Sequence, residues 1–303
     1  MGAFTSLPLV GAAVNAVALP APRLAGSLSR RMWALPGPPR AVRDADRELH
    51  EAADTATVRL DGWEVVTYAW GDTSRPVLLV HGWRSRALRF APLVRRLVDL
   101  GYGPVSWDAP GHGATPGPVG TILDALRIQR LLQERHGRFH AVVAHSLGAP
   151  FAVHALREGL EADRAVLLAG VSDFDYLITA FSDALRLGPR ARGALRTAVE
   201  RHYFDADPAV WERFSTTHRI DTLEQPFLLL HDDTDEVVPF AHSLRTLEHL
   251  GGRGRMIATT GLGHSGALFE REHLDAIAAF VRGVGAPDAG LPAPSAPDGL
   301  RTA

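Results

Sequence analysis

The sequence predicts an α/β fold, with a mostly parallel central sheet of about eight strands flanked by helices and an α-helical insertion. The first observation is that short apolar runs alternate with helical segments from about residue 76 onward. The second is that this alternation stops between residues 172 and 225 and then resumes. Strands that alternate with helices form parallel sheets through right-handed crossovers. A single domain of this class often reaches the 303 residues of the chain.

The expected strands include one at 76–80 that is apolar along its whole length, which is typical of a strand buried on both faces. They lie at 57–60, 63–69, 76–80, 104–107, 141–144, 164–168, 227–230 and 255–258. The expected helices lie at 42–53, 90–100, 122–135, 150–159, 240–250 and 268–281. Asp61-Gly62 separates the first two strands and predicts a two-residue hairpin turn.

This pattern divides the chain into five segments. We expect an N-terminal helical arm and connector at 1–44, a core formed by 45–171 and 226–283, a helical cap at 172–225, and a disordered tail at 284–303. The cap would lie over the carboxyl edge of the sheet. The tail is rich in Pro, Gly and Ala, a composition that does not support a packed core.

The first 22 residues carry no charged side chain. Arginines follow this stretch instead of preceding it, which disfavours a signal peptide, and prolines interrupt it, which disfavours a membrane span. We expect an arm packed on the domain of a cytoplasmic protein. Membrane contact by the arm and an atypical export signal stay open as alternatives.

The composition excludes several classes of function. The formal net charge of −2 gives no electrostatic basis for binding nucleic acid. The sequence contains no Cys, which rules out disulfides, thiolate catalysis and Cys-ligated metals. The His residues show no metal-binding spacing such as H-E-x-x-H, so we expect neither a metal nor another cofactor. The oligomeric state stays open.

The strongest chemical signal surrounds Ser146. An apolar strand runs directly into Ala144-His145-Ser146-Leu147-Gly148, and a helix follows. This order of strand, small–x–Ser–x–Gly turn and helix is typical of a nucleophile elbow, in which the tight turn exposes the Ser Oγ. Ala144 stands where Gly is usual, but it is also small. The N–H of Leu147 would point at a developing oxyanion.

A nucleophilic serine needs a general base that is oriented by a carboxylate. The strand expected at 227–230 runs into a carboxylate-rich turn that contains Asp235, and the strand at 255–258 runs into the Gly-flanked His264. We therefore predict that Ser146 is the nucleophile, His264 the general base and Asp235 the orienting acid.

From about residue 76 to 281 the sequence resembles the α/β-hydrolase fold superfamily, in its esterase/lipase-like serine hydrolase branch with a helical cap. The resemblance rests on the blocks LLVHGW, DAPGHG, AHSLGA, HDDTDEVVP and GLGH, which occur in the order of the family. It implies that Asp235, in a D-x-x-x-P pattern, is the acid ahead of its neighbours Asp232 and Asp233. It also implies that the backbone N–H of Trp83 is the second oxyanion donor. His81 and the DAPGHG block are expected to be structural.

Four side chains are candidate substrate-binding residues: Trp83, His145, Tyr176 and Phe181. We expect the Trp83 indole to form a wall of the acyl pocket, and His145 either to line that pocket or to support the elbow. Tyr176 and Phe181 belong to an aromatic-rich cap, of which one or two side chains would line the cavity. The cap also carries an arginine run, Arg186, Arg190, Arg192, Arg196 and Arg201. This run is expected to be a solvated helix face, or else a site for an anionic substrate end or an acidic carrier protein.

The leading hypothesis is therefore a serine hydrolase that cleaves a small-molecule carboxylic ester of short or medium acyl chain through an acyl-enzyme. The same three residues would also serve a thioesterase, an amidase, a C–C hydrolase or an acyltransferase. A ligand-binding protein without catalysis is the remaining alternative. The substrate itself cannot be read from the sequence, because the cap selects it.

Overall fold

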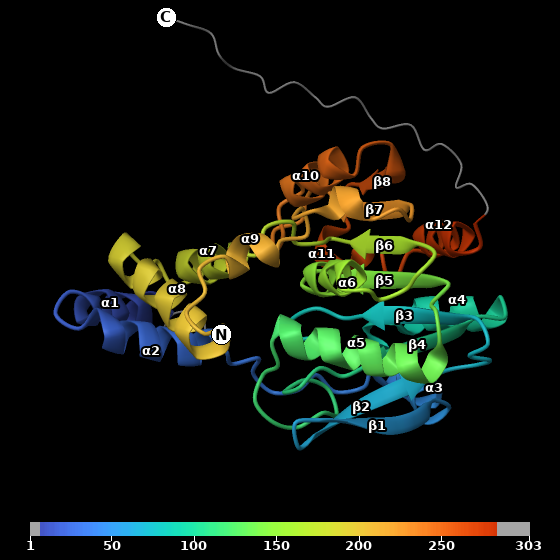
Figure 1. Ribbon diagram of the computed structural model, residues 1–303, viewed down its shortest axis with the longest axis horizontal. Helices are drawn as coiled ribbons and strands as arrows, with labels where there is room; N and C mark the ends of the chain where they lie inside the picture. Colours follow the sequence, from blue (N-terminus) through green and yellow to red (C-terminus); the bar gives the residue numbers. More distant parts are fainter. Residues whose placement is uncertain (1–6, 284–303) are drawn as a thin grey trace, which may run out of the picture.

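A single sheet of eight strands, in the order β1-β2-β4-β3-β5-β6-β7-β8, forms the centre of the computed structural model, which describes residues 7–283 (Figure 1). The strands are β1 (Asp54–Leu60), β2 (Trp63–Ala69), β3 (Pro76–Val80), β4 (Gly103–Trp107), β5 (Ala141–His145), β6 (Ala165–Leu168), β7 (Phe227–Asp232) and β8 (Gly254–Thr259). β2 pairs antiparallel with both β1 and β4, and all other neighbours pair parallel. The predicted sheet is confirmed.

The hairpin between β1 and β2 closes with the two-residue turn that the sequence predicts. Leu60 pairs with Trp63, and the two residues between them have positive φ, 49° at Asp61 and 84° at Gly62. Positive φ at both central positions defines the turn type that matches the twist of a hairpin, and Asp-Gly accommodates it.

Helices cover both faces of the sheet. One face carries α5 (Ile122–His136), α6 (Gly148–Arg157) and α10 (Ala241–Leu250), and the other carries α4 (Ala91–Asp99) and α12 (Arg271–Val281). Every residue of β3, β4, β5, β6 and β7 is buried between these layers. This two-sided burial explains why the central strands read as continuous apolar runs.

The predicted helix at 42–53 forms in part. A short 3-10 turn at 44–46 leads into α3 (Arg47–Glu51). Residues 52 and 53 lie in a turn, and β1 begins directly after them at Asp54, which pairs with Ala69.

Five helices form a separate lobe beyond the carboxyl ends of the parallel strands (Figure 1). They are α7 (Tyr176–Ala184), α8 (Pro189–Tyr203) and α9 (Val210–Arg213), from the interval between β6 and β7, and the N-terminal helices α1 (Leu7–Ala18) and α2 (Pro22–Trp33). We call these five helices the helical lobe, and α1 with α2 the N-terminal arm.

The N-terminal arm packs on the other helices of the lobe instead of on the sheet. Val14 and Ala25 are buried in one apolar cluster with Leu195 of α8. The backbones approach closely: a Cβ at Gly11 would lie 1.7 Å from the Leu185 carbonyl oxygen, and one at Gly26 would lie 2.3 Å from that of Ala194. Only glycine permits such approaches. In residues 7–283, no helix has both the length and the apolar character needed to cross a bilayer. The predicted tail at 284–303 lies outside the described residues.

Candidate active site

Ser146 lies on a tight turn between β5 and α6. Its φ is 59°, in the left-handed region that residues other than glycine rarely adopt and that is concentrated at functional sites. A Cβ at Gly148 would lie 2.2 Å from the Val80 carbonyl oxygen, so the first turn of α6 packs directly against the end of β3. The small residue at 148, two positions after the serine, is therefore required by packing, as a nucleophile elbow demands.

A chain of two hydrogen bonds joins the three residues that the sequence singles out. His264 Nε2 lies 2.9 Å from Ser146 Oγ, and His264 Nδ1 lies 2.7 Å from Asp235 Oδ2. A carboxylate accepts hydrogen bonds, so it favours the tautomer in which Nδ1 carries the proton and Nε2 can take one from the serine. The arrangement can therefore deprotonate Ser146 as it attacks an electrophile.

The neighbouring carboxylates of the same turn have other partners. Asp232 accepts hydrogen bonds from Thr259 Oγ1 at 2.7 Å and from the Leu262 N–H at 2.9 Å, which ties β7 to the turn after β8. Asp233 is exposed and accepts from Thr260 Oγ1. Of the three candidate acids, only Asp235 contacts His264.

The loop after β3 lies directly against the elbow. A Cβ at Gly82 would lie 2.9 Å from both the His145 carbonyl oxygen and the Ser146 Cβ, so a side chain there would push the loop away. Among residues 7–283, neither the Trp83 N–H nor the Leu147 N–H donates to another backbone carbonyl. Both amides lie beside the serine and have no backbone acceptor, which suits a role as oxyanion donors.

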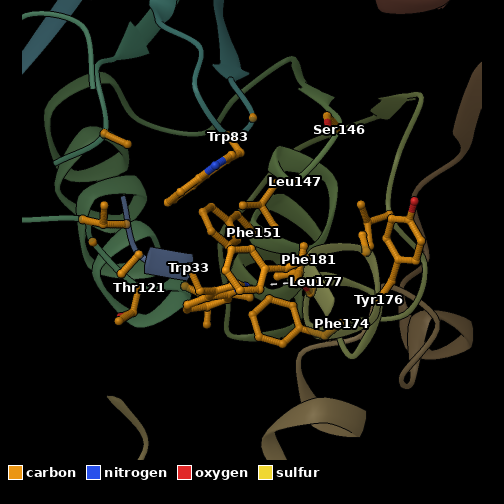
Figure 2. Close-up of a pocket in the computed structure, with 18 of the residues that line it drawn as sticks. Trp33, Trp83, Thr121, Ser146, Leu147, Phe151, Phe174, Tyr176, Leu177 and Phe181 are labelled. Atoms are coloured by element: carbon orange, nitrogen blue, oxygen red, sulfur yellow. Dashed lines mark hydrogen bonds between the residues drawn. The ribbon is translucent and has the colours of Figure 1, made fainter. Parts of the chain in front are cut away.

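A cavity of about 280 Å³ lies between the core and the helical lobe, and Ser146 is part of its wall (Figure 2). Its other walls are mostly apolar and rich in aromatic rings. They include Trp33, Trp83, Phe151, Phe174, Tyr176, Leu177, Phe181, Tyr203 and Phe204. Three of the four predicted substrate-binding residues, Trp83, Tyr176 and Phe181, therefore line the cavity.

Residues 77–301 match a family model described as the alpha/beta hydrolase family. The chain belongs to this family. The resemblance inferred from the sequence motifs is thereby confirmed. The match begins at the second residue of β3, so it leaves out the N-terminal arm of this alpha/beta hydrolase.

Individual proteins that resemble the chain do so at low sequence identity or over only part of its length. A non-heme chloroperoxidase from Kitasatospora aureofaciens is 34% identical over 91 residues, which are 29% of this chain and 33% of that protein. The chain thus aligns with only a third of that relative's length. Two solved structures share the fold at low identity. An esterase from Pyrococcus furiosus has a TM-score of 0.61 at 15% identity, over 81% of this chain and 95% of its own. A monoacylglycerol lipase from Paleococcus ferrophilus has a TM-score of 0.55 at 18% identity, over 73% of this chain and all of its own.

Asp235 is held in its ionised form in this alpha/beta hydrolase. Its carboxylate is buried, and Oδ1 accepts the N–H groups of Val237 and Val238 at 2.8 and 3.0 Å. Burial acts to raise the pKa of Asp235, but hydrogen bonds from His231, His264 and the Val238 N–H outweigh it and hold the pKa well below its ordinary value. Asp235 therefore stays charged at neutral pH.

His231 is a contact of Asp235 that no sequence motif predicts. Its Nε2 lies 3.2 Å from Asp235 Oδ2 and 2.9 Å from the Val238 carbonyl oxygen, which can only accept, so Nε2 carries the proton. Its Nδ1 lies 2.7 Å from Ser243 Oγ. The available signal was a polar ring in an otherwise apolar strand, four residues before Asp235.

His145 does not line the cavity. It is buried behind His264, with its Nε2 3.0 Å from the His264 carbonyl oxygen and the two ring centroids 4.8 Å apart. Burial, together with the neighbouring His264, lowers the pKa of His145 to about 3. A neutral ring that donates to the backbone of His264 supports the site, so the placement favours the second of the two predicted roles.

Trp33 is a cavity residue that no sequence motif indicates. It comes from the end of α2, and its Nε1–H donates to the Leu177 carbonyl oxygen at 3.3 Å. Figure 2 shows it across the labelled aromatic side chains from Ser146. Tyr176, by contrast, lies near the turn of the acid, where its hydroxyl donates to the Val237 carbonyl oxygen at 2.6 Å. Trp33 of α2 and Tyr176 of α7 thus contribute different parts of the cavity wall.

The remaining family motifs support loops. His81 Nδ1 lies 2.8 Å from the Gly82 carbonyl oxygen, and His81 Nε2 accepts the Ala109 N–H at 3.0 Å. Burial lowers the pKa of His81 to about 4, so the ring is neutral. Asp108 accepts the N–H groups of Ala87 and Ala114 at 2.7 Å each. Within residues 7–283 no three metal-ligating side chains converge.

Proposed function

We propose that this alpha/beta hydrolase cleaves carboxylic esters of short or medium acyl chain through an acyl-enzyme intermediate. One observation carries the proposal. The hydrogen-bonded chain of Ser146, His264 and Asp235 ends at a serine that opens onto a mostly apolar cavity. A general base, its orienting acid, a nucleophile and a space for an acyl group therefore adjoin one another.

The proposed reaction begins when His264 Nε2 takes the Ser146 proton and Oγ attacks the ester carbonyl carbon. The oxyanion of the tetrahedral intermediate accepts from the N–H groups of Trp83 and Leu147. His264 then protonates the leaving alcohol, and the acyl group stays on Ser146. Water, deprotonated by the same histidine, attacks the acyl carbon. The bond from the acyl carbon to Oγ then breaks, His264 returns its proton to Oγ, and the carboxylic acid product leaves. Asp235 stays ionised throughout and stabilises the imidazolium of His264.

The size of the cavity supports the proposed acyl length. Its volume of about 280 Å³ lies near the lower end of the range of roughly 300–1,000 Å³ that is usual for small-molecule sites. A short or medium acyl chain fits that space, whereas a palmitoyl chain would have to extend outside it.

The test combines a fluorophosphonate probe with a panel of p-nitrophenyl esters from acetyl to palmitoyl and one thioester. We expect the wild-type chain to be labelled and to prefer the shorter esters. Ser146→Ala should abolish labelling and leave only the roughly 10³–10⁴-fold acceleration over water that binding and the oxyanion donors supply. Ser74→Ala, at an exposed serine outside the cavity, is the matched control and should behave like wild type.

Three outcomes would count against the proposal in different ways. Wild-type turnover in Ser146→Ala would remove the serine from the nucleophile role. Labelling without ester turnover, together with hydrolysis of the thioester, would keep the mechanism and replace the substrate class. An unlabelled and inactive wild-type chain would favour a ligand-binding protein.

A further inference from the structure

The outer face of α1 is entirely apolar. Leu9 is 74% exposed, and Leu19, just after the helix, is 66% exposed. The helix contains one polar side chain, Asn15, and it turns inward: its Nδ2 donates to the Arg186 carbonyl oxygen at 3.0 Å, and its Oδ1 accepts the Gly188 N–H at 2.8 Å. The face toward solvent is therefore left to leucine, alanine and proline, which is unusual for a surface in contact with water only.

The outer face of α2 continues this apolar surface. Leu24 and Leu28 are 54% and 40% exposed, and Leu35, just past the end of the helix, is 68% exposed. Leu24, Leu28 and Arg31 are spaced four and three residues apart, so they form one stripe along the helix. Of the nine large apolar side chains exposed among the described residues, five belong to residues 9–35. The exposed apolar surface is thus concentrated on the N-terminal arm.

A basic groove between α2 and α8 adjoins the leucine stripe. Arg23 and Arg30 contribute to it from α2, and Arg190 and Arg201 from α8. No Asp or Glu lines the groove, and in residues 7–283 none of these four arginines pairs with a carboxylate. Arg30 donates instead to Tyr203 Oη at 3.3 Å. The groove therefore holds four positive charges without an internal counterion.

The arginine run of α8 thus divides into two groups. Arg192 pairs with Asp183, and Arg196 pairs with Asp175 at 2.7 Å, so these two charges are neutralised within the lobe. Arg190 and Arg201 face the groove and remain available to an external anion. The N-terminal segment adds to this positive charge, since the first 43 residues contain five Arg and no Asp or Glu.

We propose that the outer surface of α1, α2 and α8 binds an anionic lipid bilayer. The apolar faces of α1 and α2 would enter the boundary between headgroups and acyl chains, and the arginines of the groove would meet lipid phosphates. An apolar helix face beside unpaired basic side chains is the combination by which helices lie in a membrane interface. A second copy that docked through the same face would place its arginines near those of the first, and like charges oppose such contact. Charge complementarity therefore favours the anionic bilayer.

The experiment measures co-sedimentation of the full chain with vesicles of phosphatidylcholine alone or of phosphatidylcholine mixed with phosphatidylglycerol, at low and high salt. We expect binding to the anionic vesicles, weakening as salt rises, and little binding to the neutral ones. Because each arginine near an anionic surface contributes about a fivefold gain in affinity, the double variant R190A/R201A should bind roughly 25-fold more weakly.

Two further variants separate the apolar and charged contributions. The pair L24S/L28S changes exposed side chains only and should also weaken binding, since it removes the part that enters the bilayer. The pair R59A/R271A removes the same charge as the groove variant at side chains that are 84% and 96% exposed elsewhere, and it should bind like wild type. Circular dichroism of each variant verifies that the fold is intact.

The proposal is overturned if the wild-type chain fails to bind anionic vesicles, or if it binds neutral vesicles equally well. It is also overturned if R59A/R271A weakens binding as much as R190A/R201A, because net charge alone would then explain attraction. Light scattering measures the oligomeric state of the wild-type chain and of L24S/L28S. A dimer that L24S/L28S dissociates would show that a second copy of the chain covers this face instead of lipid.

Discussion

Replacing Trp33 with Ala should change which acyl chains the enzyme prefers. The indole lines the cavity across the aromatic cluster from Ser146, and its Nε1–H donates to the Leu177 carbonyl oxygen. Under the proposed function, an acyl chain held on Ser146 would extend toward this ring. Trp33 would then limit the length of chain that the cavity accepts.

The size of the effect follows from burial. Each methylene transferred from water into the cavity contributes about 0.8 kcal/mol, which is about a fourfold gain in kcat/KM. The wild-type profile should therefore rise about fourfold per methylene until the cavity of about 280 Å³ is full, and then fall. Trp33→Ala removes about nine non-hydrogen atoms from the wall, and partial collapse will recover some of that space. Even if only two methylenes gain room, the ratio of longer to shorter esters should increase by about tenfold or more.

The assay is kcat/KM across the p-nitrophenyl ester series. Trp33→Phe keeps a ring but loses the hydrogen bond to Leu177, so its optimum should stay close to that of wild type. Trp63→Ala is the matched control, because Trp63 is a half-buried tryptophan of β2 that does not line this cavity. A profile in Trp33→Ala that drops uniformly for all esters, or that shifts no more than in Trp63→Ala, would refute the role of the indole.

Three other predictions concern the site. Asp235→Asn should lower kcat on the order of 10⁴-fold. Asp233→Asn should stay near wild type, and Asp232→Asn should act mainly on stability. A larger kinetic loss at Asp232 or Asp233 than at Asp235 would reassign the orienting role to that residue. Gly82→Ala should lower kcat by about 10²–10³-fold because its Cβ would displace the loop that carries the proposed oxyanion donor, the Trp83 N–H. Gly193→Ala, whose Cβ meets nothing within 4 Å, is the control. Although burial acts to raise them, hydrogen bonds hold the pKa values of Asp232 and Asp235 well below the ordinary 3.8. Their contribution to stability is therefore fully present above about pH 3.8 and is lost as the pH falls toward the pKa values of the folded state. Acid unfolding, monitored by circular dichroism, should depend less steeply on pH in Asp232→Asn than in wild type. Equal pH dependence in the two proteins would contradict this.

The features that the sequence predicts correctly are those whose cause is local. The turn at Asp61-Gly62 depends on two residues that tolerate positive φ, and the central strands depend on continuous apolar runs. The residues proposed as nucleophile, base and acid each follow a strand directly, so the parallel sheet brings Ser146, Asp235 and His264 to one edge.

The features that the sequence does not predict depend on contacts between distant segments. Nothing near Trp33 indicates that α2 packs on α8 and carries the indole to the cavity. His231 is different, because it lies only four residues before Asp235 and reaches it through the turn at the end of β7. The packing of α2 on α8 is decided by tertiary contacts, which local propensity does not encode.

Under the proposed function, the close backbone contacts of the N-terminal arm would place determinants of acyl preference far from Ser146 in the sequence. Gly11 and Gly26 hold the arm against Leu185 and Ala194 only because neither glycine has a side chain. A methyl group at either position would tilt the arm and carry Trp33 away from the cavity. A mutational scan for altered acyl preference should therefore find sensitive positions more than 100 residues before Ser146, in a region that precedes the family match at residue 77. A truncated enzyme cut at that family boundary would lose this wall, so activity measured on it would describe a different pocket.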